Sequence, residues 1–577
     1  MRFTTTTLSV LALSAAASAQ TARDLVSVEP GAGTFTPAIA SDGDLSAILI
    51  TDSGDVRIST SDGRGLTWST PVSITSGGAS FSSTRNNHER MLAVVGNSIY
   101  AVWQDNRNDD GVSPAENDLF LAVSNDGGAT FAPEIVIPKG APAGTGALRN
   151  FRLRVAPGEG GNPDLVYVLQ SIDPSTVDEE LYLTVSIDGG GSFLPAVLVP
   201  QGGAGDVDEI AFDVDGDNVY VAFVDDRAGT GFDDLYFQRS TDRGQTWQPT
   251  DASIDGTGPG LGDVADTQVD VVVQGSKVAV CWAEEDSGTG NEILHLTVSN
   301  DSGVTFGPVY DIGGYTPVTH DVDVPTMVMT EGGRIYIVWE DNRTGSDRVY
   351  VAATDDDGAT FTESEVSLAD NAAFPQIIAR EGSETQVFVQ WTEDVGTDDE
   401  LFGTYSVDGG ASFGTPARLT PVGTDSDFGF AAVNPLYNNF LVVTEQENTL
   451  GSDETNVGGF RGQDLDIGGF NAGMTVITLG LENYDSPAVA GSFGAILGSA
   501  STGDLLLPEA ATRNLGITFD AVTNLTLSLP FTTPNGPGLA VSADLPAGLT
   551  WSFVGIGIGT GSGALFGDIT DVVTVSN

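Results

Sequence analysis

The sequence predicts an all-β protein in which a seven- or eight-bladed β-propeller is followed by a small C-terminal β-sandwich. Three observations support this prediction. An eight-residue string recurs at intervals of 52 to 62 residues, and repeats of roughly this period are typical of proteins built from stacked supersecondary units. Short strand-like runs precede each copy, and residues 25–460 show no amphipathic helical pattern.

The repeated string contains an aspartate, one or more glycines, a hydroxyl residue and a closing aromatic residue. The copies are "SNDGGATF" (124–131), "SIDGGGSF" (186–193), "STDRGQTW" (240–247), "SNDSGVTF" (299–306), "TDDDGATF" (354–361) and "SVDGGASF" (406–413), with a looser copy, "TSDGRGLTW", at 60–68. Their aspartates are Asp126, Asp188, Asp242, Asp301, Asp356 and Asp408.

The segments between the strings alternate apolar and polar residues, as in "SIYAVW", "DLFLAVS", "NVYVAF" and "RIYIVW". Such runs, punctuated by Gly, Asp and Asn, indicate short antiparallel strands. Four strands per repeat, arranged radially, make a propeller blade. Residues 427–460 supply three further strands, and the segment after residue 20 supplies a fourth. Joining them predicts an eighth blade closed by both ends of the chain; without that closure there are seven.

The string Ser/Thr-x-Asp-x-Gly-x-Thr/Ser-Trp/Phe resembles the Asp box of the sialidase-like, or BNR-repeat, propellers. The resemblance implies that each box forms the turn between the third and fourth strands of a blade. An aspartate can accept hydrogen bonds from the backbone N–H groups that follow it, and glycine permits positive φ. We expect the six aspartates to be structural, because catalysis needs different groups that converge from different blades.

A second repeated element ends each second strand, as in "WQDNR", "FVDDR" and "WEDNR". Its acids could form a ring that binds a cation or sugar hydroxyls. Alternatively, each acid braces its own loop, with Arg107, Arg227 and Arg343 as partners, because guanidinium forks suit carboxylates. The repetition favours the second interpretation. The acids are Asp105, Asp225, Glu284, Asp341, Glu393 and Glu445.

Non-repeated arginines are candidates for ligand binding. The loop 83–90 carries Arg85, His88, Glu89 and Arg90, and the segment 148–157 carries three more. We expect Arg85, Arg90, Arg149, Arg152 and Arg154 to bind a carboxylate or sulfate; the alternative is that they pair with surrounding acids.

The string "FRLR" (151–154) is similar to the Phe/Tyr-Arg-Ile-Pro motif of sialidases, whose arginine grips the substrate carboxylate. Arg152 occupies the arginine position, although Arg154 replaces the proline and the string stands in the third blade. The resemblance also implies a tyrosine nucleophile and an aspartate acid/base. Tyr315 and Asp321, with His320 beside them, lie on a loop of the right type.

The string "DVDGDN" (213–218) places Asp213, Asp215 and Asp217 at alternate positions, as in a calcium loop. The remaining EF-hand ligands do not follow, and other blades have a tight turn here, so a hairpin turn is favoured over calcium. The histidines and the single cysteine are too sparse for a zinc or redox site. We therefore expect no cofactor, with calcium as the alternative.

Composition excludes several classes of partner. The formal net charge is −58, with only two lysines, which would repel nucleic acid and anionic membranes. Cys281 is the only cysteine, so no intramolecular disulfide forms. Residues 1–19 have the pattern of a secretory signal peptide, and no later run is apolar enough to span a membrane. We expect a secreted monomer.

The sequence thus predicts three segments: a signal peptide (1–19), the propeller (20–460) and a C-terminal β-sandwich (461–577) with runs such as "MTVITLGL" and "NLTLSLPF". The predicted function is glycan or surface binding without catalysis, with a glycan or another polar extracellular ligand as partner. The alternative is an exo-acting glycoside hydrolase of the sialidase type on acidic sugars.

Overall fold

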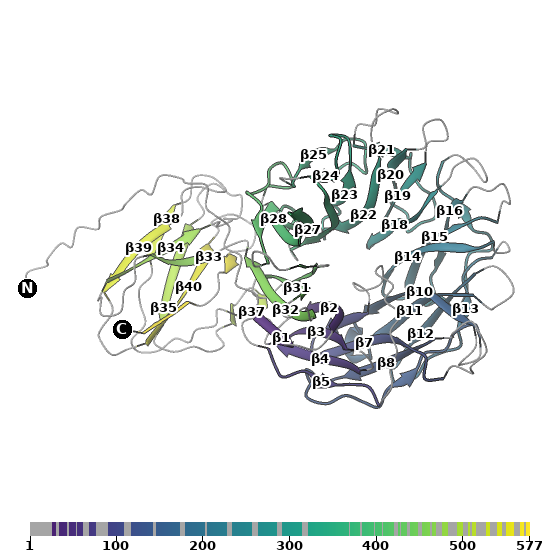
Figure 1. The fold of residues 1–577 in the computed structure, drawn as a ribbon, viewed down its shortest axis with the longest axis horizontal. Helices are drawn as coiled ribbons and strands as arrows, with labels where there is room; N and C mark the ends of the chain where they lie inside the picture. Colours follow the sequence, from purple (N-terminus) through teal and green to yellow (C-terminus); the bar gives the residue numbers. More distant parts are fainter. Residues whose placement is uncertain are drawn as a thin grey trace, which may run out of the picture. The chain divides into compact units, whose positions relative to one another are not determined.

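The computed structural model describes residues 26–29, 34–76, 91–108, 117–285, 291–313, 321–434 and 439–461, apart from short gaps inside these ranges, and the strands between residues 464 and 576. Its larger part is a ring of four-stranded antiparallel sheets, the blades, which radiate from a central axis (Figure 1). Seven blades consist of consecutive strands, and an eighth closes the ring. The prediction of an all-β propeller is therefore confirmed.

The blades are numbered in chain order. Blade 1 contains β2 (Thr34–Asp42), β3 (Leu45–Asp52), β4 (Asp55–Ser61) and β5 (Val72–Ser73). Blade 2 contains β6 (Leu92–Val95), β7 (Ser98–Asp105), β8 (Asp118–Ser124) and β9 (Ile135–Val136). Blade 3 contains β10 (Ala147–Ala156), β11 (Leu165–Asp173), β12 (Glu180–Ser186) and β13 (Val197–Leu198), with a short 3-10 helix at Glu159–Gly161. Blade 4 contains β14 (Val207–Asp215), β15 (Asn218–Asp225), β16 (Asp234–Ser240) and β17 (Ala252–Ser253).

The second half of the ring repeats this order. Blade 5 contains β18 (Val264–Gln274), β19 (Lys277–Glu285), β20 (Glu292–Ser299) and β21 (Tyr310–Ile312). Blade 6 contains β22 (Val322–Met329), β23 (Ile335–Asp341), β24 (Arg348–Thr354) and β25 (Thr362–Glu365). Blade 7 contains β26 (Ala372–Ala379), β27 (Val387–Val395), β28 (Asp398–Ser406) and β29 (Ala417–Arg418).

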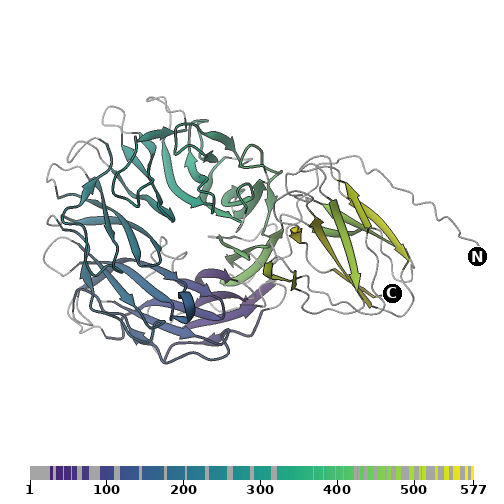
Figure 2. The ribbon, with the colours of Figure 1, turned by 180° about the vertical axis from the view of Figure 1, so that it is seen from behind.

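Blade 8 is assembled from both ends of the propeller segment. β30 (Gly429–Asn434), β31 (Asn439–Glu447) and β32 (Asp453–Arg461) come from its end, and β1 (Val26–Glu29) adds the outermost strand. β1 pairs antiparallel with β32, with Val26 opposite Val457. The view from behind shows the purple start of the propeller segment meeting its green end at this blade (Figure 2). Of the two predicted blade counts, the sheet topology therefore matches the closed eight-bladed arrangement.

The second strand of each blade is buried on both faces, because each sheet packs between two neighbouring sheets. Along β7, every residue after Ser98 is buried. The apolar run is therefore nearly continuous, which is the pattern of a strand covered on both sides. Large aromatic side chains fill the space between the blades, and Trp103, Trp282, Trp339 and Trp391 have no exposed surface.

The six repeated turns share one set of hydrogen bonds. In the first, the Thr130 backbone N–H donates to Asp126 Oδ1 over 2.8 Å, and the Thr130 hydroxyl donates to Asp126 Oδ2 over 2.6 Å. The Gly128 N–H donates to the hydroxyl of Ser124, which itself donates to Asp126. Gly127 and Gly128 have φ of 71° and 83°, which explains the glycines of the string. Equivalent bonds surround Asp188, Asp242, Asp301, Asp356 and Asp408.

A second compact unit contains residues 460–577. One sheet contains β33 (Asp464–Gly468), β34 (Val476–Glu482) and β39 (Leu539–Asp544). Another contains β35 (Phe493–Ser499), β38 (Leu527–Pro530), β40 (Thr550–Ile558), β41 (Phe566–Ile569) and β42 (Val573–Ser576). A ribbon contains β36 (Leu506–Leu507) and β37 (Ala510–Asn514). Two antiparallel sheets agree with the predicted C-terminal sandwich. Among the described residues, no helix is both long and apolar enough to cross a membrane.

Candidate functional site

The three arginines predicted on residues 148–157 all lie on β10, the innermost strand of blade 3, and each pairs with an acid. Arg149 is half exposed and contacts Asp173 and Glu179. Arg152 is 4% exposed, and its Nη2 donates to Glu209 Oε1 over 2.8 Å. The ion-pairing alternative thus describes their contacts in this structure, and their role in ligand binding stays a proposal.

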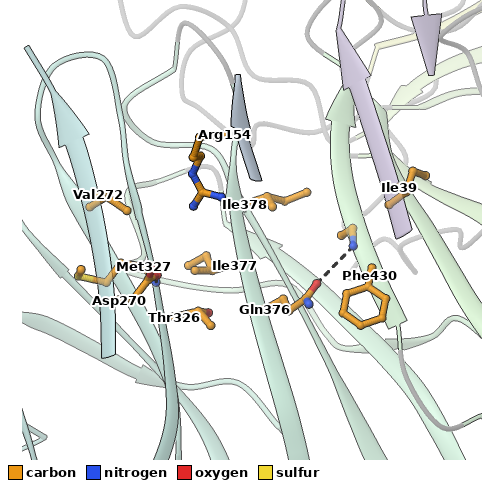
Figure 3. Close-up of a pocket in the computed structure, with 11 residues that line it drawn as sticks. Ile39, Arg154, Asp270, Val272, Thr326, Met327, Gln376, Ile377, Ile378 and Phe430 are labelled. Atoms are coloured by element: carbon orange, nitrogen blue, oxygen red, sulfur yellow. Dashed lines mark hydrogen bonds between the residues drawn. The ribbon is translucent and has the colours of Figure 1, made fainter. Parts of the chain in front are cut away.

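Arg154 lines a cavity. The cavity measures about 180 Å³ and lies between the innermost strands of several blades (Figure 3). This volume exceeds the space that a single water needs, roughly 10–15 Å³, and is smaller than the 300 Å³ or so of a drug-sized pocket. The lining residues are Ile39, Arg154, Asp270, Val272, Thr326, Met327, Gln376, Ile377, Ile378, Phe430 and Ala431. We call this space the central cavity.

Polar side chains in the wall of the central cavity connect neighbouring blades. Asp270 on β18 accepts a hydrogen bond from the Met327 backbone N–H on β22, over 2.9 Å. Gln376 on β26 accepts one from the Ala431 N–H on β30, over 3.3 Å, drawn in Figure 3. These bonds hold the inner strands at the spacing that leaves the cavity between them.

Arg154 also takes part in the contacts that join neighbouring blades around the cavity. Its Nε lies 3.2 Å from Asp213 Oδ1 on β14, and Asp213 Oδ2 accepts a bond from the Val273 N–H on β18. The Nη1 of Arg154 donates to the Leu153 carbonyl, which leaves Nη2 without a partner among the described residues. A guanidinium N–H group is therefore available on the cavity wall.

Thr326 supplies a second unsatisfied polar group. Its Oγ1 is buried and has no hydrogen-bond partner among the described residues. A buried hydroxyl without a partner costs about 1–3 kcal/mol, so such a group is usually satisfied by water or a ligand. Together with Arg154, Asp270 and Gln376, it gives the cavity polar groups among apolar ones, which is the composition of small-molecule sites.

Glu340, which we did not select from the sequence, is an unusual carboxyl group near this region. Glu340 lies on β23, opposite Asp323 of β22. Val338, two residues before Glu340 on β23, lies opposite Thr326 of β22. Its carboxylate accepts a 2.5 Å bond from the Phe374 backbone N–H. Burial, reinforced by the charges of Asp323 and Asp347, raises the pKa of Glu340 to about 8. A carboxyl group of this kind is protonated at neutral pH and can act as a general acid.

No family model matches the chain, and no curated protein matches it. Among solved structures, the polysaccharide lyase Uly1 is 10% identical, covering 77% of this chain and 99% of its own, with a TM-score of 0.44. A polysaccharide lyase of the PL25 family, an ulvan lyase, is 10% identical over 75% of this chain and 95% of its own, with a TM-score of 0.40. The intramolecular trans-sialidase from Ruminococcus gnavus is 11% identical over 65% of this chain and 95% of its own, with a TM-score of 0.35.

The acids that end the second strands brace their own blades. The side chains of Asp105, Asp225 and Asp341 are fully buried and pair with the arginines two residues on, as in the bracing interpretation. In blades 5, 6 and 7 the acid also accepts a bond from the indole N–H of the preceding tryptophan, as Glu393 does from Trp391 over 2.9 Å. The side chain of Glu445 lies outside the described residues.

The remaining predicted residues divide into two groups. Arg85, His88, Glu89, Arg90, Tyr315 and His320 lie outside the described residues. Asp321 is described: it accepts a bond from the Glu292 N–H, and its own N–H donates to Asn342, so it joins the loops of blades 5 and 6. The string 213–218 forms the turn between β14 and β15, in which Asp217 pairs with Arg243.

Comparison between blades could have identified Glu340. At its position, directly before the repeated acid, the other blades have Gln104, Val224, Ala283 and Thr392. A lone ionisable residue at an otherwise uncharged position is the signal of a non-repeated function. Thr326 and Gln376 carry no such signal, because hydroxyl and amide side chains occur throughout the strands.

Proposed function

We propose that the propeller binds a glycan through the central cavity and does not transform it. The observation that carries this proposal is the cavity itself, which is lined by Thr326 and Arg154, two residues with a polar side-chain atom that has no hydrogen-bond partner among the described residues. Its size suits one small polar ring rather than an extended chain. The signal-peptide pattern of residues 1–19 supports the further proposal that binding takes place outside the cell.

The ion pairs of β10 support binding rather than sialidase chemistry. A carboxylate clamp needs several convergent arginines, and such a clamp would have to displace Asp173 and Glu179 from Arg149, Glu209 from Arg152 and Asp213 from Arg154. Breaking a buried pair such as Arg152–Glu209 costs about 3–5 kcal/mol. We therefore expect uncharged sugars to bind in preference to acidic ones.

A glycan array followed by calorimetry on the retained sugars tests this proposal. Thr326→Val removes the hydroxyl and keeps the shape, so we expect it to weaken binding at least about fivefold, the loss of one hydrogen bond. Thr362→Val, on the exposed outer strand β25 of the same blade, is the matched control and should bind like the wild type. Equal binding by both variants would place the ligand elsewhere, and retention of no sugar would reject glycan binding.

Glycoside hydrolysis by an exo-acting enzyme is the second candidate, and the Glu340–Asp323 pair favours it. Glycosidases use one protonated and one ionised carboxyl group. The raised pKa of Glu340 and the exposed position of Asp323 would supply such a pair. Turnover of a panel of fluorogenic glycosides that disappears in Glu340→Gln but persists in Glu331→Gln, an exposed glutamate of the same blade, would replace the binding-only proposal.

A further inference from the structure

Two inner strands begin with a turn that holds a bulky side chain on left-handed backbone. Val324 on β22 has φ of 48° and Phe374 on β26 has φ of 53°, and each comes directly before a proline. Positive φ is an outlier for a β-branched or bulky residue, and the residue before a proline is ordinarily extended. Strain of this kind persists only where the surrounding structure imposes it, and it gathers at functional sites. Both turns are therefore candidates for a binding site.

The two turns are held in different ways. In blade 6, the Val324 N–H donates to the carboxylate of the preceding residue, Asp323, over 2.7 Å. Blade 7 has Ala373 at the equivalent position, and the Phe374 N–H donates instead to the carboxylate of Glu340, over 2.5 Å. Glu340 is buried and belongs to blade 6. The strained turn of blade 7 is thus fixed by a buried group from the neighbouring sheet.

The segment that leads into the turn of blade 7 is fixed as well. The Asn371 Nδ2 donates to Asp394 Oδ2 at the end of β27 over 2.9 Å, and the Ser346 hydroxyl donates to Asn371 Oδ1 over 3.0 Å. The Ala372 N–H donates to the Asp347 carbonyl over 3.1 Å. These bonds attach the segment to loops of both blades. A ligand that used this turn would therefore lose little affinity to the ordering of the protein.

The side chain that this rigid turn presents to solvent is the phenyl ring of Phe374, which is 44% exposed. A single exposed apolar side chain is ordinary, but one held at a cost in strain is not. β26 begins where β27 ends, with Ala372 opposite Glu393, so the ring lies on the face opposite the repeated turns. Gln376 and Ile377, which line the central cavity, follow within three positions. The exposed ring and the cavity wall thus share one strand.

The charges around the turn are negative. Burial raises the pKa of Glu340, and the charges of Asp323 and Asp347 raise it further, so these carboxylates act on the same small region. Arg348, on the adjoining strand β24, is itself paired with Asp370 over 2.6 Å. Like charges brought together at a binding surface weaken the complex. An acidic or sulfated sugar would be repelled here, whereas an uncharged sugar would not.

We propose that Phe374 is a stacking platform for an uncharged pyranose ring. The proposal rests on the glycan binding proposed above and adds to it a second subsite, next to the central cavity, and a class of ligand, a neutral oligosaccharide of at least two rings. One ring occupies the cavity and the next ring lies on Phe374. The C–H groups on one face of a pyranose are apolar, and they pack on an aromatic ring through dispersion and the burial of apolar surface.

Saturation-transfer NMR titrations with cellobiose, lactose, maltose and mannobiose test the platform in the full chain. Asparagine tolerates left-handed backbone, so Phe374→Asn should keep at least the urea midpoint of the wild type while its affinity for the bound disaccharide falls about two- to tenfold, the value of one ring contact. Phe374→Tyr keeps the ring and should bind like the wild type. Val304→Asn, which removes an exposed apolar side chain from a repeated turn of blade 5, is the matched control and should also bind normally.

The outcomes separate the platform from the central cavity. A disaccharide that Thr326→Val binds weakly and Phe374→Asn binds like the wild type would overturn the platform and leave glycan binding in the cavity. The reverse pattern would support the platform and reject the cavity. A lower urea midpoint for Phe374→Asn would show that the ring serves packing and would overturn the proposal. Tighter binding of an acidic hyaluronan disaccharide, or no transfer to any of the four neutral sugars, would overturn it as well.

Discussion

The buried ion pair between Arg152 and Glu209 gives the sharpest test of how blades 3 and 4 are joined. Their side chains are 4% and 6% exposed, and Arg152 Nη2 lies 2.8 Å from Glu209 Oε1. Arg152→Met keeps most of the apolar volume but leaves the Glu209 carboxylate buried without this partner. Removing one member of such a pair costs about 3–5 kcal/mol, so we expect the free energy of unfolding to fall by that amount.

Urea denaturation of four proteins provides the assay: wild type, Arg152→Met, Glu209→Leu and the double variant. We expect each single variant to lose about 3–5 kcal/mol, and the double variant to lose less than either, because no buried charge remains. A coupling energy near zero would refute the reasoning, as would an Arg152→Met variant within about 1 kcal/mol of the wild type.

Three further predictions concern single carboxyl groups. The hydrogen bonds from Thr305 lower the pKa of Asp301 to about 2. Their contribution to the stability of the fold is therefore complete above pH 3.8, the ordinary value, and is lost as the pH falls through 2. Asp301→Asn should accordingly lower the urea midpoint at pH 7 but not at pH 2. Glu340 has a pKa of about 8 against an ordinary 4.5, so the free energy of unfolding of the wild type should fall by about 5 kcal/mol as the pH rises between those values, at about 1.36 kcal/mol per unit. Glu340→Gln should lack this fall in the same urea series. Asp270→Ala removes the acceptor of the Met327 N–H and should cost about 1–3 kcal/mol in thermal unfolding, with Asp270→Asn costing less.

The sequence predicts the blades well because their determinants are local. The turn at Asp126 needs a carboxylate, a glycine and a hydroxyl within seven positions, and the hydrogen bonds of its Ser124 and Asp126 side chains that define the turn join residues at most four apart. The same is true of the five other turns, so the period of the repeat is visible without knowledge of the fold. The closure of blade 8 follows from counting strands, since three strands remain at one end and one at the other.

The candidate site was harder to predict because its contacts are distant in sequence. From the sequence, Arg152 has the features of a ligand-binding residue. In the structure it contacts Glu209, which is 57 positions away in the sequence and lies on the neighbouring inner strand β14. The central cavity joins Thr326, Gln376 and Phe430, which lie on three different blades. Six inner strands also have a register shift near their start, as between Asp323 and Thr326, and such bulges decide which side chains face the axis. These strands are β2, β10, β14, β18, β22 and β26.

The pairing of β1 with β32 has a consequence for the order in which the chain can assemble. Val26 meets Val457, so the first strand must wait for a partner that is synthesised 431 residues later (457 minus 26). Until then β1 has no neighbour, and the ring remains an open arc with an unpaired strand at one end. Contacts of such long sequence separation form slowly, and a free strand edge invites pairing with another molecule. The closure of this protein is therefore the step at which a nascent chain is most exposed to association with its own copies.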